Sequence, residues 1–131
     1  MKRFVLATAA VVAFATVALA APMTATVTMG ANKVLADSKS MVLYTYDKDT
    51  KGAAQTACTG ACAGNWPPFI AAATDKADGD WTIINGTDKD GKTAVKQWAY
   101  KGLPVYYYSK DAKAGDATGD GVGGIWHVVK M

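Results

Sequence analysis

Two cysteines and one histidine are the side chains of this sequence whose types suit metal or redox chemistry. Cys58 and Cys62 frame the segment CTGAC as the only thiols, and His127 is the only imidazole. The cysteine spacing is not the C-x-x-C of thiol-redox sites, and no His follows Cys62 as in a haem attachment motif. In an exported chain such a pair predicts a disulfide. The alternative is a soft-metal site that uses both thiolates with His127.

A glycine-rich and aspartate-rich loop imitates part of a calcium site. In DATGDGVGG, residues 116–124, Asp116, Thr118 and Asp120 alternate before a glycine, as at the start of a calcium-binding loop. The twelfth position, however, holds His127 where a bidentate Glu is required. We therefore expect a turn that glycine makes possible and commit to no metal, with Asp116 and Asp120 as the candidate ligands if a cation binds.

The composition disfavours most catalytic machinery. The chain has no Glu, a single His and no G-x-S-x-G segment, so it has few of the usual general acids and bases and no motif for an activated serine. Asp and Tyr can still act as acid or base when their pKa values are perturbed. Arg is absent after residue 3, and no basic cluster marks a nucleic-acid surface. We expect no catalytic residues, no cofactor and no nucleic-acid partner.

A tyrosine motif occurs twice. LYTYDKD at residues 43–49 returns as VYYYSKD at residues 105–111. In a strand, the two Tyr side chains of each copy point to one face and the apolar residue before them to the other. We interpret the copies as a repeated structural unit of core and corner residues that joins two halves. The alternative is an aromatic surface that stacks a planar or saccharide ligand. The residues concerned are Tyr44, Tyr46, Asp49, Tyr106, Tyr108, Asp111, Trp66 and Trp126.

The whole chain after residue 20 follows the same duplication. Placing Tyr44 on Tyr106 aligns the turns and, after a small shift, the tryptophans, which predicts two copies of a unit of about fifty residues. We place them at about 24–72 and 81–131, joined by a polar connector. Each copy is too small for a sufficient core. We therefore expect residues 21–131 to form one pseudo-symmetric domain.

Short alternating segments between turn residues predict the fold class. TATVTM at residues 24–29 alternates Thr with Ala, Val and Met, and similar runs bounded by Asp, Gly and Lys follow in both halves. We predict an all-β fold, mainly antiparallel, with two similar four-stranded halves. The alternative is an α+β fold with one short helix in the Ala-rich segment near 53–63.

The first twenty residues have the pattern of a cleavable export signal. Lys2 and Arg3 precede an apolar run over 4–19 that ends in small residues with A-x-A spacing, which predicts a signal peptide at 1–20 and cleavage before Ala21. The remainder carries twelve Lys against eleven Asp, a formal charge of +1. We expect a periplasmic or secreted protein without a membrane span after cleavage.

Several motifs in order resemble one family. The pattern Y-x-[F/W/Y]-x-x-D at 44–49 and 106–111, with CTGACAGNWPP and GDGVGGIWHVVK, is similar to the bacterial secreted repeat family named for that motif, often described as predicted lipoproteins. The resemblance covers about residues 30–131. It implies an exported bacterial tandem repeat and brings no established activity. The chain lacks the lipobox Cys of a lipoprotein, which speaks against a lipid anchor.

These observations favour a non-enzymatic exported module of binding or structural type, with an unknown ligand. Its partner would be an envelope component or a small ligand. The alternative is a metal-binding or thiol-redox protein that uses Cys58, Cys62 and His127.

Overall fold

The computed structural model describes residues 21–131, so the predicted signal peptide lies outside the described residues. Within this range the chain is mostly β, which confirms the all-β prediction. The helix of the α+β alternative exists at the end of the Ala-rich segment, but it is only one turn long. The elements are β1 (Thr24–Met29), β2 (Asn32–Asp37), β3 (Tyr44–Tyr46), α1 (Ala61–Asn65), β4 (Trp81–Thr87), β5 (Ala94–Tyr100), β6 (Leu103–Pro104), the 3₁₀ helix η1 (Val122–Gly124) and β7 (Trp126–Val128).

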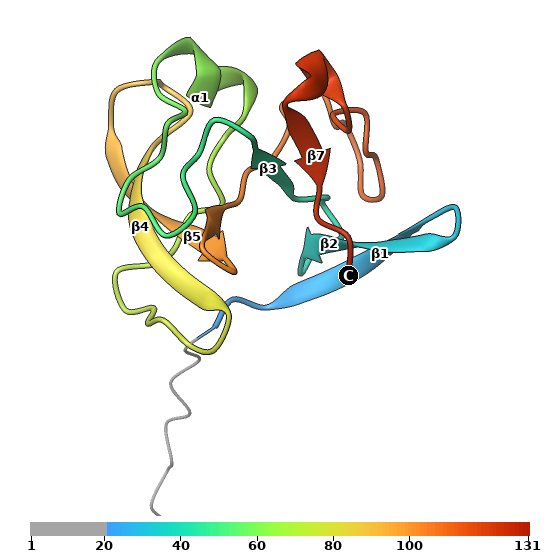
Figure 1. Cartoon of the computed structure of the whole chain (residues 1–131), viewed down its shortest axis with the longest axis horizontal. Helices are drawn as coiled ribbons and strands as arrows, with labels where there is room; N and C mark the ends of the chain where they lie inside the picture. The colour runs from blue at the N-terminus through green and yellow to red at the C-terminus, as the bar shows by residue number, and fades with distance from the viewer. Residues whose placement is uncertain (1–20) are drawn as a thin grey trace, which may run out of the picture.

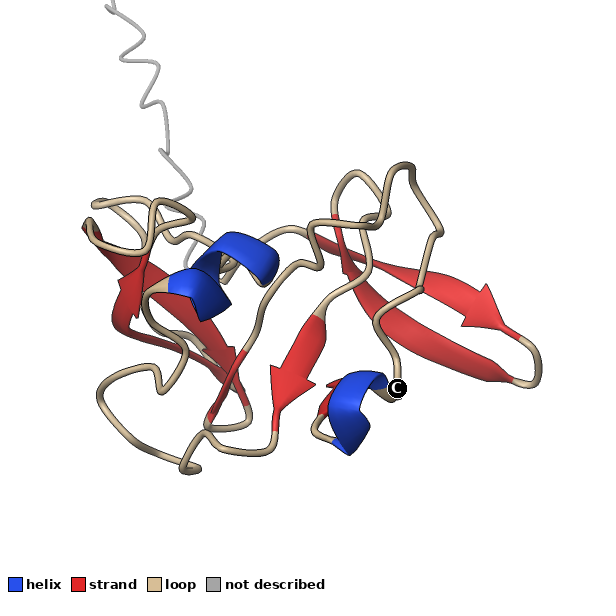
Figure 2. Cartoon of the chain, turned by 90° about the horizontal axis from the view of Figure 1, so that it is seen from above, coloured by secondary structure: helices blue, strands red, loops and turns tan. Residues whose placement is uncertain are grey.

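The strands form three antiparallel sheets, β1-β2, β3-β7 and β4-β5-β6. In Figures 1 and 2 the β1–β2 hairpin lies at one end of the molecule and β4–β5 at the other, with β3 and β7 between them. The two halves do not form separate sheets. The central sheet takes β3 from the first half and β7 from the second, because the last strand of each half pairs with the other half.

This exchange is reciprocal. After β7 the chain runs beside β2, where the Leu35 N–H donates to the Val129 carbonyl at 2.8 Å. In the same way the end of the first half runs beside β5, where the Trp98 N–H donates to the Phe69 carbonyl at 2.8 Å. The final segment of each half therefore completes the sheet of its neighbour.

The two motif copies meet at the centre of the exchange. The Tyr44 N–H donates to the Tyr106 carbonyl at 2.8 Å, and the Tyr106 N–H donates to the Tyr44 carbonyl at 2.9 Å. Equivalent residues that bond each other in both directions lie on an approximate twofold axis. The first and second halves are thus related by a pseudo-twofold that passes between these two tyrosines.

Turn chemistry sets the hairpins that lead into each motif copy. In the first half the Asp37 carboxylate accepts from the Lys39 and Met41 N–H groups at 2.9 and 3.0 Å, and Ser40 has φ 64°. In the second half Lys101 and Gly102 have φ 50° and 83°, the positive values that a two-residue hairpin turn needs. The two hairpins differ in length, but both return the chain toward the axis.

Strand alternation divides the interior into two clusters. Tyr44 and Tyr106 enter one cluster, and their neighbours Leu43 and Val105 enter the other, as the alternation of the motif predicts. The buried members of the first cluster are Val34, Val42, Tyr44, Cys58, Trp66, Tyr106, Trp126 and Val128. Those of the second are Leu35, Leu43, Phe69, Ala71, Trp81, Trp98 and Val105.

Candidate functional site

The motif side chains bond between the halves. The Tyr44 hydroxyl donates to the Asp111 carboxylate at 2.5 Å, and the Tyr106 hydroxyl donates to the Asp49 carboxylate at 2.6 Å. Both tyrosines are fully buried, and the two carboxyl groups are nearly so. We call these contacts the exchanged pairs. Through them the Tyr of each motif copy bonds to the Asp of the other copy.

The second oxygen of each Asp fixes the loop that follows it. Asp49 Oδ1 accepts from the Ala57 N–H at 2.7 Å, and Asp111 Oδ1 accepts from the Thr118 N–H at 2.9 Å. The Thr118 hydroxyl also donates to Asp111, and Thr56 Oγ1 lies 2.6 Å from the Tyr106 hydroxyl. Sequence reasoning missed these two threonines, although each stands at the same spacing after its motif Asp.

Burial perturbs the acidity of the exchanged pairs. Desolvation raises the pKa of Asp49, against the opposing effect of the hydrogen bonds from Tyr106 and Ala57. Desolvation and the adjacent carboxylates raise the pKa values of Tyr44 and Tyr106 far above the ordinary value for a phenol. Burial, with the Asp37 carboxylate that its hydroxyl bonds at 2.7 Å, does the same for Tyr107.

The raised phenol pKa values predict a loss of stability in alkali. In the unfolded chain Tyr44 and Tyr106 ionise near pH 10, whereas in the folded chain they stay protonated. Their contribution is present below pH 10 and is lost above it, by about 1.4 kcal/mol for each phenol per pH unit. Urea unfolding between pH 9 and 11 measures this slope. The Tyr44→Phe variant should have a smaller slope, and an unchanged slope would contradict the assignment.

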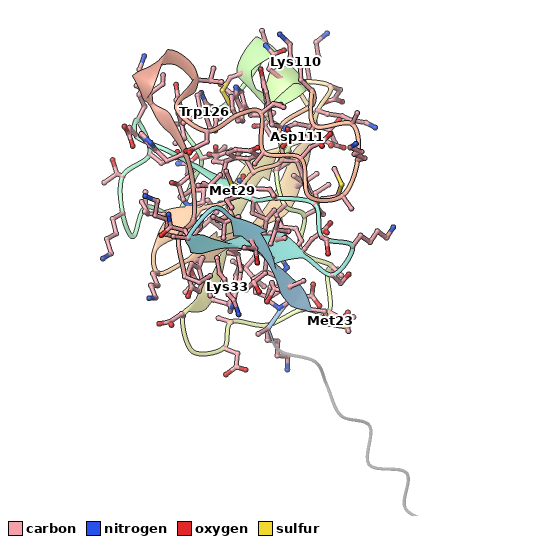
Figure 3. The ribbon with its side chains drawn as sticks, turned by 90° about the vertical axis from the view of Figure 1, so that its right-hand side faces the viewer. Met23, Met29, Lys33, Lys110, Asp111 and Trp126 are labelled. Carbon is pink, nitrogen blue, oxygen red and sulfur yellow. A yellow bond between two sulfur atoms is a disulfide. The ribbon has the colours of Figure 1, made fainter. Side chains whose placement is uncertain are left out.

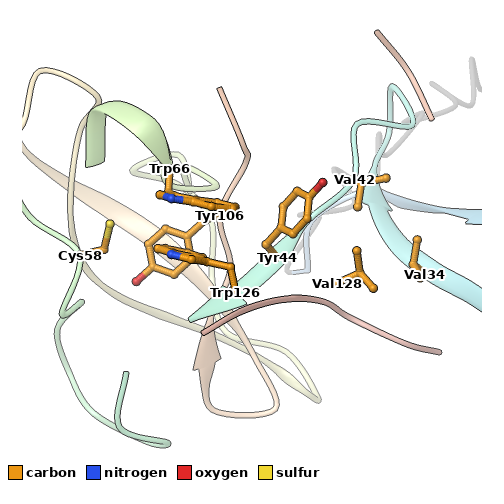
Figure 4. Packing of buried hydrophobic residues seen from close by; sticks show 8 residues of the cluster. All are labelled: Val34, Val42, Tyr44, Cys58, Trp66, Tyr106, Trp126 and Val128. Atoms are coloured by element: carbon orange, nitrogen blue, oxygen red, sulfur yellow. The ribbon is translucent and has the colours of Figure 1, made fainter. Parts of the chain in front are cut away.

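Four aromatic rings from both halves form a continuous parallel stack, which we call the ring stack. Tyr46 lies on Trp126 at 4.2 Å between ring centres, Trp126 on Trp66 at 3.8 Å, and Trp66 on Tyr108 at 4.1 Å. The two indoles differ by only 3° in plane (Figure 4). The pseudo-twofold passes between them, since Tyr46 and Trp126 repeat the arrangement of Tyr108 and Trp66.

The ring stack is an interior feature. Trp66 and Trp126 are 5% and 4% exposed, and each is also contacted edge-on by Tyr44 or Tyr106. Gly119 lies so close to Trp66 that a Cβ at this position would stand 2.8 Å from the indole. The indole faces that a planar ligand or a sugar would need are therefore covered by other parts of the chain.

The cysteines form the predicted disulfide. Cys58 and Cys62 are joined, with their Cα atoms 5.3 Å apart; Cys58 lies in the loop before α1, and Cys62 lies within the helix. No free thiol is present in the described residues. The alternative of a metal site built on Cys58, Cys62 and His127 is wrong, because both sulfur atoms are joined in the bridge and no group of metal ligands occurs among residues 21–131.

Reduction of this bridge should lower stability measurably. For a loop as short as the one from Cys58 to Cys62 the chain-entropy relation gives a loss of about 2 kcal/mol. Urea unfolding with and without a reductant measures it. A variant with both cysteines replaced by Ala should be insensitive to the reductant, and a wild-type midpoint that does not move would show that the bridge adds nothing to folding.

The acidic loop and the histidine do not converge on a cation site. The Asp116 carboxylate accepts from the Ala112 and Lys113 N–H groups at 3.1 Å, and Asp120 accepts from the Val128 N–H at 3.1 Å. His127 Nε2 lies 2.8 Å from an Asp47 oxygen on the surface. Among residues 21–131, no three His, Cys or Asp side chains come together as a metal site would require.

A surface hollow of about 280 Å³ lies away from the motif. Phe69 and Trp98 line it from the second cluster, and Ser38 and Asp75 are polar residues in its wall. Met23 and Ile70, 66% and 48% exposed, also line it. Sequence reasoning did not find this hollow, because its lining comes from five stretches that are separated in the sequence.

Comparison with known proteins places the chain in a family. Two segments, residues 23–70 and 85–130, match the family described as a secreted repeat of unknown function. No curated protein and no solved structure matches the sequence. Within the described range, no helix is long and apolar enough to cross a membrane. Since the two matched segments span well over half of its length, the chain belongs to this family of secreted repeats of unknown function.

Proposed function

We propose that the chain is a periplasmic, non-catalytic binding module whose duplicated aromatic motif forms the scaffold and whose ligand enters the surface hollow. The observation that carries this is the pair of large apolar side chains, Met23 and Ile70, left exposed at the hollow. Concave sites with apolar walls and few polar groups are the usual places for small ligands. The Cys58–Cys62 bridge supports an oxidising compartment.

The lining defines a class of ligand. Met23 and Ile70 offer the exposed apolar surface, the buried Phe69 and Trp98 also stand in the wall, and Asp75 contributes the one carboxylate of the lining. One Asp75 oxygen accepts from the Ala72 N–H at 2.7 Å, which holds the carboxylate in place while its charge is open to solvent. An apolar body that carries an amine fits these groups, because the apolar part contacts Met23 and Ile70 and the cation meets the carboxylate.

Phenethylamine is a suitable probe for this proposal. Titration followed by two-dimensional NMR should shift the signals of Ile70, Met23 and Trp98 together, while residues of the ring stack stay unchanged. Asp75→Asn keeps an acceptor for the Ala72 N–H but removes the charge, so it should weaken the amine and leave neutral 2-phenylethanol unaffected. Equal binding of both probes would overturn the amine class, and no shift at the hollow would overturn the site.

We further propose that residues 21–131 fold as one cooperative domain. The exchanged pairs and the exchanged final strands support this, since neither half completes its own sheet. A single calorimetric transition is expected, with equal calorimetric and van't Hoff enthalpies. Two resolved transitions would contradict the proposal.

A further inference from the structure

In the described chain, the outer edge of β1 is an unpaired strand edge, which plays no part in the proposed ligand site. β1 pairs with β2 over its full length, and within residues 21–131 no other strand or bridge joins it. The hairpin forms one end of the molecule, and in Figure 3 it faces the viewer between Met23, Met29 and Lys33. A strand in this position has a row of backbone N–H and carbonyl groups without hydrogen-bond partners in the described part of the chain.

The register identifies those groups. Leu35 on β2 directs its N–H to Val129 and its carbonyl to the Leu43 N–H, so both point away from β1. Leu35 lies opposite Thr26, which makes this a pair without mutual hydrogen bonds and turns the Thr26 N–H and carbonyl outward. Alternation along the strand gives Thr24 and Thr28 the same orientation.

The corresponding edge of the other half is covered. On β4, Asn85 accepts from the Thr56 N–H and donates to the Ala54 carbonyl, both at 2.9 Å. Lys33 and Lys96 are equivalent, because the carbonyl of each accepts from the final segment of the other half, at Met131 and Ala71. Thr28 lies opposite Lys33 and Asn85 lies opposite Lys96, so Thr28 is the counterpart of Asn85. The fold thus adds an extended segment at this position in the second half, whereas in the first half the position is open.

The side chains of β1 lack the features that usually protect an edge. Thr24–Met29 contains no charge and no proline, and its ladder with β2 has no bulge. The three Thr side chains are exposed on one face, while Ala25, Val27 and Met29 are half-buried on the other. Because no charges oppose each other, the segment is compatible with an identical segment laid antiparallel to it.

We propose that β1 is an assembly edge, which pairs antiparallel with β1 of a second copy around a twofold axis at Thr26. Thr26 then exchanges both backbone hydrogen bonds with Thr26 of the second copy, and Thr24 does so with Thr28 of the second copy. Thr side chains pair directly on one face, a favourable cross-strand contact, and Ala25 pairs with Val27 of the second copy on the other. The paired strand lies beside the hollow and not in it, since Met23, directly before β1, is the lining residue next to the strand.

The association is weak, because one short strand buries far less surface than a stable dimer needs. We expect a dissociation constant of roughly 10 µM to 1 mM. Sedimentation of the chain as isolated after export should show the average mass rising toward that of a dimer over this range. The amide protons of Thr24, Thr26 and Thr28 should gain protection with concentration, unlike those already bonded to β2.

Thr26 variants test the geometry. Thr26→Pro removes an outward N–H that β2 does not use, so the monomer should keep its fold and lose dimerisation, whereas Thr26→Val should dimerise like the wild type. Thr26→Lys and Thr26→Glu each place like charges opposite one another and should weaken the dimer at least tenfold, while an equal mixture of the two should form heterodimers.

Each result decides the proposal. Dimers in the mixture but not in the separate Lys and Glu variants support the twofold at Thr26 even if the Pro variant fails to fold. A monomer at every concentration up to 1 mM would overturn it, including the case in which the edge serves a strand of another protein. A dimer unaffected by the charge variants would place the interface elsewhere and equally overturn it.

Discussion

Asp49→Ala should lower the free energy of unfolding by about 3 kcal/mol. The change leaves the buried Tyr106 hydroxyl and the Ala57 N–H without their acceptor, and each unsatisfied buried donor costs about 1 to 3 kcal/mol. Asp111→Ala should cost a similar amount, since it removes the acceptor of Tyr44 and Thr118. Urea unfolding at neutral pH measures both, with the exposed Asp80→Ala as the reference.

A double-mutant cycle separates pairing between the halves from pairing within one half. Tyr106→Phe and Asp49→Ala should be coupled by about 1 to 2 kcal/mol, because they remove the same buried hydrogen bond. Tyr106→Phe and Asp111→Ala, which belong to one motif copy, should add to within about 0.5 kcal/mol. Strong coupling in the second cycle and none in the first would contradict the exchange.

The local structure of this chain could be predicted because it depends on near neighbours. The Thr alternation of TATVTM fixes both the bounds of β1 and its exposed face, and the motif alternation correctly divides Tyr44 from Leu43 between two clusters. The disulfide follows from the cysteine pair in an exported chain. In each case the decisive residues lie within a few positions of one another.

The exchange of final strands could not be predicted, because the repeat supplies two equivalent partners for each strand. β7 can pair with the Tyr segment of its own half or with β3, and both carry the same alternating pattern. The preceding hairpin strand already pairs with one edge of each Tyr segment. The long loop after the motif then returns the final strand to the region of the axis, where both Tyr segments are within reach. Which Tyr segment β7 pairs with is decided only when the two halves pack together. The ring stack depends on this pairing, so it could not be predicted either.

The same duplication explains why the motif is conspicuous in sequence yet hidden in the structure. Residues at a pseudo-twofold axis contact their own counterparts, so one substitution per repeat alters both sides of the contact. Tyr44 and Tyr106, and likewise Trp66 and Trp126, stand at such positions. The surfaces away from the axis differ between the halves, as the open edge of β1 and the hollow beside Asp75 do. We therefore look for binding in the asymmetric parts of the chain.

Trp126→Ala should be the most damaging single change, at about 3 to 5 kcal/mol, the range for truncating a buried aromatic side chain. The loss has two parts: the favourable free energy of burying the indole, and the cost of the cavity that opens between Trp66 and Tyr46. Both of these rings would lose a stacked neighbour. Trp126→Phe retains an aromatic ring and should cost less. Since a domain of this size has a stability of only about 5 to 15 kcal/mol, the Ala variant should have a greatly lowered urea midpoint.

The energetic coupling between the two indoles tests whether their stacked contact, and not burial alone, causes the loss of stability. Trp66→Phe and Trp126→Phe should be non-additive by about 1 kcal/mol, because each substitution removes the same stacked contact. Trp98→Phe, in the second cluster, is equally buried but does not contact Trp126, so that pair should be additive. Additivity of the two stacked indoles would mean that burial alone, rather than their contact across the pseudo-twofold, accounts for the stability that they provide.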